Sequence, residues 1–177
     1  MISVKTLVTG GARSGKSEYA LTLAESLPGD NAMYFVATAQ ALDDDMKTRI
    51  ENHQKRRGNN WKTVEEPVEL AETLSRLDDT KNLLLIDCLT LWTSNLQSRD
   101  ENGFGDAVSK LAAGITLFSG SLIIVTNEVG MGIVPASADT RLYRDRLGAV
   151  NRSVAEACGD VVLMVSGIPI QIKGDGK

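Results

Sequence analysis

One run of eight residues has the composition and spacing of a phosphate-binding loop. The motif Gly-x4-Gly-Lys-Ser/Thr is matched by Gly10, Gly11, Ala12, Arg13, Ser14, Gly15, Lys16 and Ser17. Glycines let the backbone curl so that successive amides point inward, and the N-terminus of a following helix adds partial positive charge. In such loops the lysine reaches the terminal phosphates and the final hydroxyl binds Mg²⁺. We therefore expect a nucleoside triphosphate here, with Lys16 as a catalytic residue and Ser17 as a metal ligand.

A second candidate for the same site is the acid that ends an apolar run. Asp87 follows Leu83–Ile86, and ligands of parallel sheets bind at the C-terminal edge of the strands. Asp87 is thus a candidate ligand of the metal or of its water shell.

The phosphate loop does not identify the base of the nucleotide. The guanine-reading string Asn-Lys-x-Asp is absent, and the nearest string, at residues 126–130, has other residues. A regulatory GTPase is therefore disfavoured.

The only histidine, His53, lies in a segment with helical periodicity. Stepping about 100° per residue from Leu42 places His53 inside the apolar stripe and puts Arg49 and Arg57 on the same face. Two interpretations remain open. His53 either packs in a core or takes part in anion binding or attack on phosphorus. Unpaired arginines are costly in a dry core, which favours the second interpretation.

Short apolar runs alternate with helical patterns, which is typical of an α/β fold with a parallel sheet between helices. Strands are predicted over Ile2–Thr9, Ala32–Thr38, Trp61–Val64, Leu83–Asp87, Ser121–Asn127, Asp160–Ser166 and Ile168–Ile172. The last two are too close for a crossover helix, so the final strand should be antiparallel and at an edge. Helices are predicted over Ser17–Leu27, Asp43–Arg57, Pro67–Leu77, Leu91–Gln97, Ala107–Phe118 and Leu142–Cys158, with loops over 98–105 and 128–137.

Composition narrows the classes of protein. A length of 177 residues predicts one domain over 1–177. The net charge of −4 offers no basic surface for nucleic acid. Two distant cysteines and one histidine give a zinc site little to build on. The apolar runs are far shorter than the roughly 20 residues of a membrane span, and the N-terminus does not resemble a signal peptide. We expect a cytoplasmic protein without nucleic acid partners.

Further sequence segments accompany the phosphate loop. They are residues 37–40, residues 43–46 and 49–50 leading to His53, and residues 61–65, 86–92, 125–135 and 165–169. With these strings the chain resembles, along nearly its whole length, the bifunctional adenosylcobinamide kinase / adenosylcobinamide-phosphate guanylyltransferase family of cobalamin biosynthesis. Many families share the loop. Residues 127–135 and the histidine helix are far more specific.

The resemblance implies a P-loop NTPase with a RecA-like three-layer fold, assembled as a homotrimer. It also implies two reactions on a corrinoid substrate. The enzyme would phosphorylate the aminopropanol hydroxyl of adenosylcobinamide with ATP or GTP. It would then transfer GMP from GTP to that phosphate, giving adenosylcobinamide-GDP and pyrophosphate. The second step in this family passes through a GMP-histidine intermediate, and His53 is the matching position.

The resemblance also implies a set of site residues. The nucleotide would be bound by Gly10 to Ser17 and by Thr38, Ala39, Gln40, Gln54, Lys55, Arg56, Arg57, Glu65 and Asp87. Ser17 and Asp87 would hold Mg²⁺. Two alternatives stay open at this point. The chain could be a P-loop small-molecule kinase in which His53 is structural, or a non-enzymatic regulatory module in which hydrolysis moves the loop at 128–137.

Overall fold

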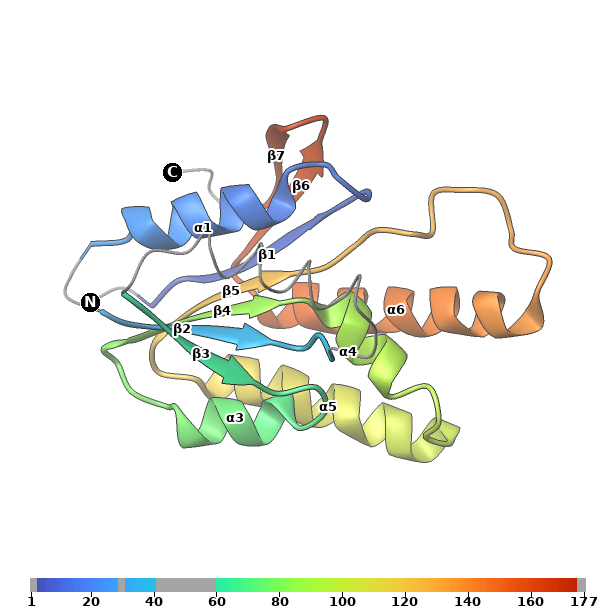
Figure 1. Ribbon diagram of the computed structural model, residues 1–177, viewed down its shortest axis with the longest axis horizontal. Helices are drawn as coiled ribbons and strands as arrows, with labels where there is room; N and C mark the ends of the chain where they lie inside the picture. The colour runs from blue at the N-terminus through green and yellow to red at the C-terminus, as the bar shows by residue number, and fades with distance from the viewer. Residues whose placement is uncertain (1–2, 29–30, 41–59, 175–177) are drawn as a thin grey trace.

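The strands form one continuous sheet (Figure 1). The computed structural model describes residues 3–28, 31–40 and 60–174. Within these residues the sheet has seven strands in the order β3-β2-β4-β5-β1-β6-β7. The strands are β1 Lys5–Gly10, β2 Ala32–Ala37, β3 Trp61–Glu65, β4 Asn82–Asp87, β5 Ser121–Val125, β6 Asp160–Val165 and β7 Ile168–Lys173. Every strand expected from an apolar run is present, with small shifts at the ends.

The sheet is parallel except at its last strand. All neighbouring pairs from β3 to β6 are parallel, and β7 pairs antiparallel with β6, which confirms the predicted edge strand. The β6–β7 turn consists of Ser166 and Gly167, whose φ angles are 52° and 84°. Positive φ at both positions is the geometry of the tight two-residue hairpin turn.

The helices cover both faces of the sheet (Figure 1). α1 Lys16–Ser26 lies on one face. The other face carries α3 Leu70–Arg76, α4 Leu89–Asn95, α5 Glu101–Leu117 and α6 Ala138–Ala157. Because strand side chains alternate between faces, each β4 residue belongs to one of two cores. Leu83 and Leu85 pack under α1, whereas Leu84 and Ile86 pack under the larger helical layer.

The start of α5 corrects a sequence prediction. The prediction of a polar loop over residues 98–105 is wrong for the second half of that range, although Gly103 and Gly105 both have low helix propensity. In the structure α5 begins at Glu101, and the Asp100 side chain caps it by accepting a hydrogen bond from the Gly103 N–H at 2.8 Å. A capping aspartate satisfies an otherwise orphaned amide and offsets the glycine cost.

Three other helix starts also differ from the prediction. α3 begins at Leu70 instead of Pro67, because the Glu66 carboxylate accepts hydrogen bonds from the amides of Val68 and Glu69 and folds 66–69 into a turn. α4 begins two residues early, at Leu89, and α6 four residues early, at Ala138. The first turn of α6 is largely exposed, so it carries no apolar signal. The helix predicted over Asp43–Arg57 lies outside the described residues.

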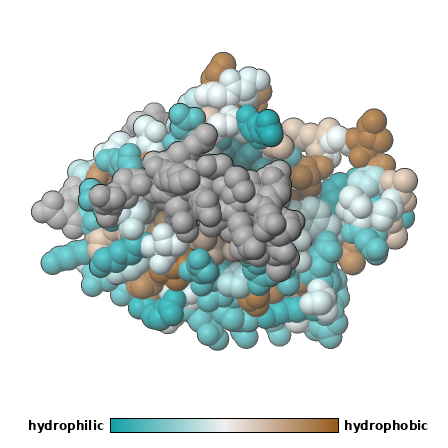
Figure 2. Space-filling view, in the orientation of Figure 1, coloured by the Kyte–Doolittle hydropathy of each residue, from teal (hydrophilic) through white to brown (hydrophobic). Residues whose placement is uncertain are grey.

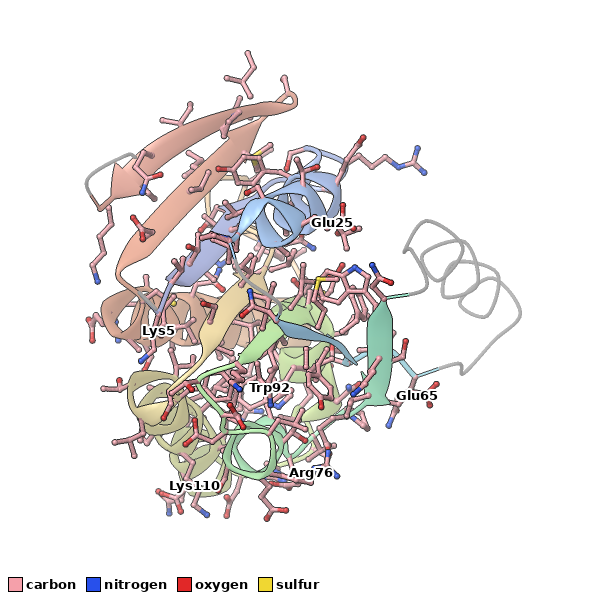
Figure 3. The ribbon with its side chains drawn as sticks, turned by 90° about the vertical axis from the view of Figure 1, so that its left-hand side faces the viewer. Lys5, Glu25, Glu65, Arg76, Trp92 and Lys110 are labelled. Atoms are coloured by element: carbon pink, nitrogen blue, oxygen red, sulfur yellow. The ribbon has the colours of Figure 1, made fainter. Side chains whose placement is uncertain are left out.

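α4 contributes Trp92 to the core beneath the larger helical layer. Trp92 is 1% exposed and is the largest fully buried side chain of the described part of the chain (Figure 3). In the same ranges no helix is long and apolar enough to cross a membrane.

Candidate nucleotide site

The loop at residues 10–17 leads from the C-terminal end of β1 into α1. Its glycines are required by geometry at both ends. A Cβ at Gly10 would lie 2.4 Å from the Met164 carbonyl oxygen, and Gly15, with φ of 91°, is the N-cap of α1. No side chain caps this helix. The amides of its first turn are therefore left to a ligand or to water, as an anion site needs.

The ammonium group of Lys16 lies inside this loop. Lys16 is 7% exposed, and its Nζ donates hydrogen bonds to the Gly11 carbonyl oxygen at 2.6 Å and to the Ser14 hydroxyl at 3.5 Å. Burial lowers the pKa of Lys16 below its ordinary value, while the nearby Cys88 and Asp87 oppose that shift. An ammonium has three donors, so one remains for a phosphate oxygen.

Ser17 and Asp87, the two residues expected to share a metal, meet at the edge of the sheet. The Ser17 hydroxyl donates a hydrogen bond to Asp87 Oδ2 at 2.9 Å, although the two residues are 70 positions apart. One hydroxyl and one carboxylate fit Mg²⁺, which prefers oxygen ligands and usually takes others from phosphates and water. The described ranges contain no group of three or more His, Cys, Asp or Glu side chains that could hold a metal alone.

Thr38 holds the backbone that follows Asp87. The Thr38 side chain is fully buried, and its hydroxyl donates to the Cys88 carbonyl at 2.7 Å and accepts from the Cys88 amide at 2.8 Å. Burial, together with Asp87, raises the pKa of the Cys88 thiol to about 11, so this thiol is neutral near pH 7. The peptide bond between Asp87 and Cys88 is cis. The hydroxyl of Thr38 is therefore engaged in positioning the Asp87 segment, and its contact with a nucleotide stays a prediction.

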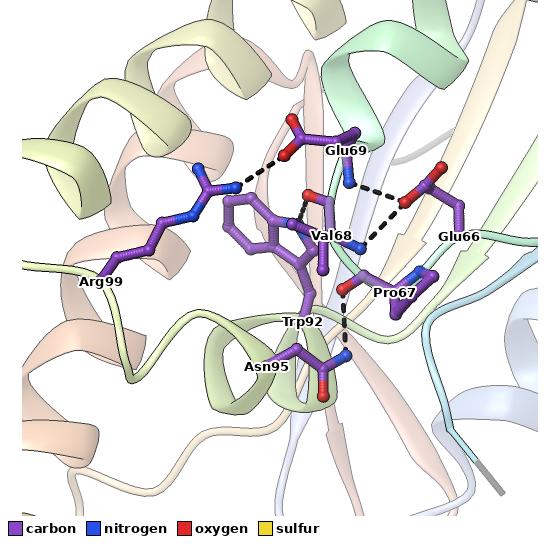
Figure 4. Close-up of polar contacts among 7 residues, drawn as sticks. All are labelled: Glu66, Pro67, Val68, Glu69, Trp92, Asn95 and Arg99. Atoms are coloured by element: carbon purple, nitrogen blue, oxygen red, sulfur yellow. Dashed lines mark hydrogen bonds and ion pairs between the residues drawn. The ribbon is translucent and has the colours of Figure 1, made fainter.

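α4 ties the ends of neighbouring strands together (Figure 4). The Asn95 amide donates to the Thr38 carbonyl at 2.9 Å and to the Pro67 carbonyl at 3.0 Å. The Trp92 indole donates to the Val68 carbonyl at 2.7 Å. Arg99, which follows α4, forms an ion pair with Glu69 at 2.6 Å. These contacts fix the segments that follow β2 and β3 relative to the helix that follows β4.

Two side-chain amides that hold the backbone around the site, those of Asn95 and Asn151, were not predicted from the sequence. Asn95 and Asn151 bond to chain segments far away in the sequence, so no local motif marks them. The sequence feature that could have identified them is their spacing from buried residues of the same helix. Asn95 follows buried Trp92 by three residues, and Asn151 follows buried Leu147 by four, so each is an amide on the buried face of its helix.

The other predicted site residues fall into two groups. Ala39 and Gln40 follow β2, and exposed Glu65 ends the edge strand β3 (Figure 3). All three lie at the same edge as the phosphate loop, but β4 and β5 separate their strands from β1. His53, Gln54, Lys55, Arg56 and Arg57 lie outside the described residues.

A cavity of about 590 Å³ lies at the opposite edge of the sheet. It is lined by Ala24, Glu25, Leu27, Asn31, Ala32, Met33, Asn60, Trp61, Lys62 and Leu83. None of these was predicted for the nucleotide site, and the phosphate loop contributes nothing to the cavity.

The fold and the sequence of the loop are those of the RecA-like class of P-loop proteins. Among solved structures, the flagellar accessory protein FlaH from Methanocaldococcus jannaschii aligns with a TM-score of 0.54 at 12% identity, covering 97% of this chain and 80% of that one. A KaiC-like protein from Pyrococcus horikoshii aligns with a TM-score of 0.50 at 16% identity, covering 90% and 70%. Likeness at this identity establishes the fold and nothing further.

Sequence similarity is more specific. The family described as cobinamide kinase / cobinamide phosphate guanyltransferase matches residues 6–172. The bifunctional adenosylcobalamin biosynthesis protein CobP of Pseudomonas aeruginosa is 39% identical over 97% of this chain and 99% of its own length. The chain belongs to this family. It is a bifunctional cobinamide kinase and cobinamide phosphate guanylyltransferase of adenosylcobalamin biosynthesis, as the resemblance of the sequence predicted.

Proposed function

We propose that the loop at 10–17 binds the terminal phosphates of ATP or GTP for the kinase step. The observation that carries the proposal is the contact of Ser17 with Asp87 at 2.9 Å beside the buried Lys16 ammonium. In this step the hydroxyl oxygen of adenosylcobinamide bonds to the γ-phosphorus. The bond from that phosphorus to the β–γ bridging oxygen breaks, the diphosphate keeps the electron pair, and the hydroxyl proton passes to water. Lys16 stabilises the charge on the transferring group.

Ser17 and Asp87 would hold Mg²⁺ in this site. When bound, Mg²⁺ neutralises charge on the β- and γ-phosphates. The protein contributes the orientation of the two oxygen ligands. Ser17 is fixed in the first turn of α1, and the segment after Asp87 is fixed by Thr38.

The same proposal assigns the guanylyl transfer to His53. A neutral imidazole nitrogen attacks the α-phosphorus of GTP, and pyrophosphate leaves with the electrons of the α–β bridge. A phosphate oxygen of adenosylcobinamide phosphate then attacks the same phosphorus and displaces the histidine. Family membership and the positions of Arg49 and Arg57 beside His53 in the sequence support this assignment. The two guanidinium groups would offset charge on the transferring group.

A homotrimer is the proposed assembly, and two exposed apolar surfaces support association between copies. One surface lies on the edge strand β7, where the side chains of Ile168, Ile170 and Ile172 share one face and are 45–64% exposed. The other is the loop before α6, where Met131 and Ile133 are 81% and 96% exposed. Figure 2 shows hydrophobic residues at the upper right of the molecule, where the loop before α6 projects in Figure 1. Exposed apolar patches of this kind mark association surfaces.

Asp87→Asn tests the phosphate-loop assignment, with Asp106→Asn as the matched control on the exposed side of α5. The assay follows transfer of a γ-phosphate label to adenosylcobinamide over a range of Mg²⁺ concentrations. Asp87→Asn should lower kcat and raise the Mg²⁺ concentration needed for half-maximal rate, because an amide is a weaker cation ligand than a carboxylate. Asp106→Asn should match the wild type. An unchanged Mg²⁺ dependence in Asp87→Asn would remove Asp87 from the site.

A further inference from the structure

Asn127 occupies a fixed place between the two strands that carry the site. It follows β5, which lies between β1 with its phosphate loop and β4 with Asp87. The hydrogen-bond ladder to β1 continues past the end of β5. Thr126 N–H donates to the Val8 carbonyl and Glu128 N–H to the Gly10 carbonyl, both at 3.0 Å. The chain at Asn127 therefore runs directly beside the first residue of the phosphate loop.

The backbone of Asn127 is also held by two helices. Its N–H donates to the Thr90 hydroxyl of α4 at 2.9 Å, and its carbonyl accepts from the Asn151 amide of α6 at 2.9 Å. Asn151 is itself oriented by the Thr126 hydroxyl, which donates to its side-chain oxygen at 2.7 Å. Both main-chain groups of Asn127 are thus fixed from the face of the sheet opposite α1.

The side chain of Asn127 is not used by this network. Across the described ranges its carboxamide has no hydrogen-bond partner, although the residue is half-buried. Polar groups in partly buried positions normally find a protein or water partner. A position whose main chain is anchored at both polar groups while its amide is left open is suited to receiving a ligand.

Strand alternation places this amide on the side of the nucleotide. Val125 pairs with Val8 of β1 and with Asp87 of β4, and both valines pack in the core under α1. Two residues further along, Gly10 and Asn127 return to the same face. By this alternation Asn127 lies on the α1 face, beside the start of the loop and two residues beyond Val125, which is in register with Asp87. Asp87 in turn accepts the hydrogen bond from Ser17.

We propose that the Asn127 carboxamide donates a hydrogen bond to the terminal phosphoryl group of the nucleotide. The proposal rests on the function proposed above, which places that nucleotide in the loop. As the substrate hydroxyl bonds to the γ-phosphorus and the β–γ bridge breaks, the amide N–H stabilises charge on the non-bridging oxygens. A preorganised neutral donor of this kind acts on the transition state without needing to reorganise.

Asn127→Ala tests the proposal, with Asn102→Ala as the control at an exposed position of α5. The kinase kcat of Asn127→Ala should fall by about 10²-fold, the typical loss when one such donor is removed. ADP should bind as to the wild type, whereas a non-hydrolysable ATP analogue should bind several-fold more weakly. The melting temperature should not change, because the anchoring bonds of Asn127 are all made by its main chain. Asn102→Ala should leave every value unchanged.

A wild-type kcat in Asn127→Ala, or equal weakening of ADP and the ATP analogue, would overturn the proposal. Lys16→Ala, assayed in parallel, distinguishes failure of the role proposed for Asn127 from failure of the phosphate-loop assignment. If Lys16→Ala loses kinase activity while Asn127→Ala does not, the role of Asn127 is wrong and the loop assignment stands. If Lys16→Ala keeps full activity, both fall together.

Discussion

Thr38→Val removes one buried hydroxyl and keeps the shape of the side chain. The Thr38 hydroxyl bonds to both main-chain groups of Cys88, at 2.7 and 2.8 Å. The Cys88 carbonyl keeps a second partner, the Trp92 N–H at 3.2 Å, whereas the structure gives the Cys88 N–H no other hydrogen bond among the described residues. An orphaned buried amide costs about 1–3 kcal/mol and a lost bond at a group that keeps a partner about 0.5–1.5. The free energy of unfolding should therefore fall by about 2–4 kcal/mol.

Urea unfolding measures this loss, with Thr38→Ser and the exposed Thr22→Val as controls. Thr38→Ser keeps the hydroxyl and should lose about 1 kcal/mol for the missing methyl group. Thr22→Val should stay within about 0.5 kcal/mol of the wild type. Kinase kcat should fall about tenfold or more in Thr38→Val, because the Asp87 segment shifts, and should recover in Thr38→Ser. A Thr38→Val protein as stable and active as Thr38→Ser would refute the positioning role.

Three further predictions concern the loop lysine and the two exposed surfaces. Lys16→Ala should lower the kinase rate by about 10²- to 10³-fold without unfolding the protein, as γ-label transfer and circular dichroism would measure; wild-type turnover would end the assignment. The loop at 128–137 should gain hydrogen-exchange protection when nucleotide and adenosylcobinamide bind, and equal protection in both states would remove it from the site. If the proposed trimer forms through β7, Ile168→Glu with Ile170→Glu should reduce the mass by light scattering from three times the 19.0 kDa chain to one, while Leu117→Glu, at a more exposed position of α5, should leave the mass unchanged; an unchanged mass in the double variant would exclude this face.

The inner strands were predictable because each contains a short apolar run with a clear boundary, whereas the edge strands β3 and β7 have polar residues among their apolar ones. Leu83–Ile86 is buried on both sides, so it has no polar alternation and reads as an inner strand. Helix starts were less predictable, because they depend on single side-chain contacts. The cap made by Asp100 and the turn made by Glu66 each moved a helix start by several residues.

The site residues also differ in how far they could be predicted from the sequence. The phosphate loop is contiguous in sequence, so residues 10–17 could be identified from spacing alone, and the strand-end position of Asp87 pointed to the same edge. The contacts of Thr38, Asn95 and Asn151 link chain segments that are 24 to 57 residues apart. Such contacts follow from the order of strands in the sheet, which one sequence does not encode locally. Asn127 belonged to the most family-specific string, yet its anchored main chain became visible only in the fold.

The most direct test of the two-step account is the fate of the α-phosphate of GTP before any corrinoid is added. Incubation with α-labelled GTP and Mg²⁺ should leave an acid-labile label on the peptide that contains His53, with one pyrophosphate released for each label bound. His53→Asn should take up no label and lose guanylyl transfer, yet retain kinase activity, because phosphorylation uses the phosphate loop. Label on another residue, or full GMP transfer by His53→Asn, would contradict the account.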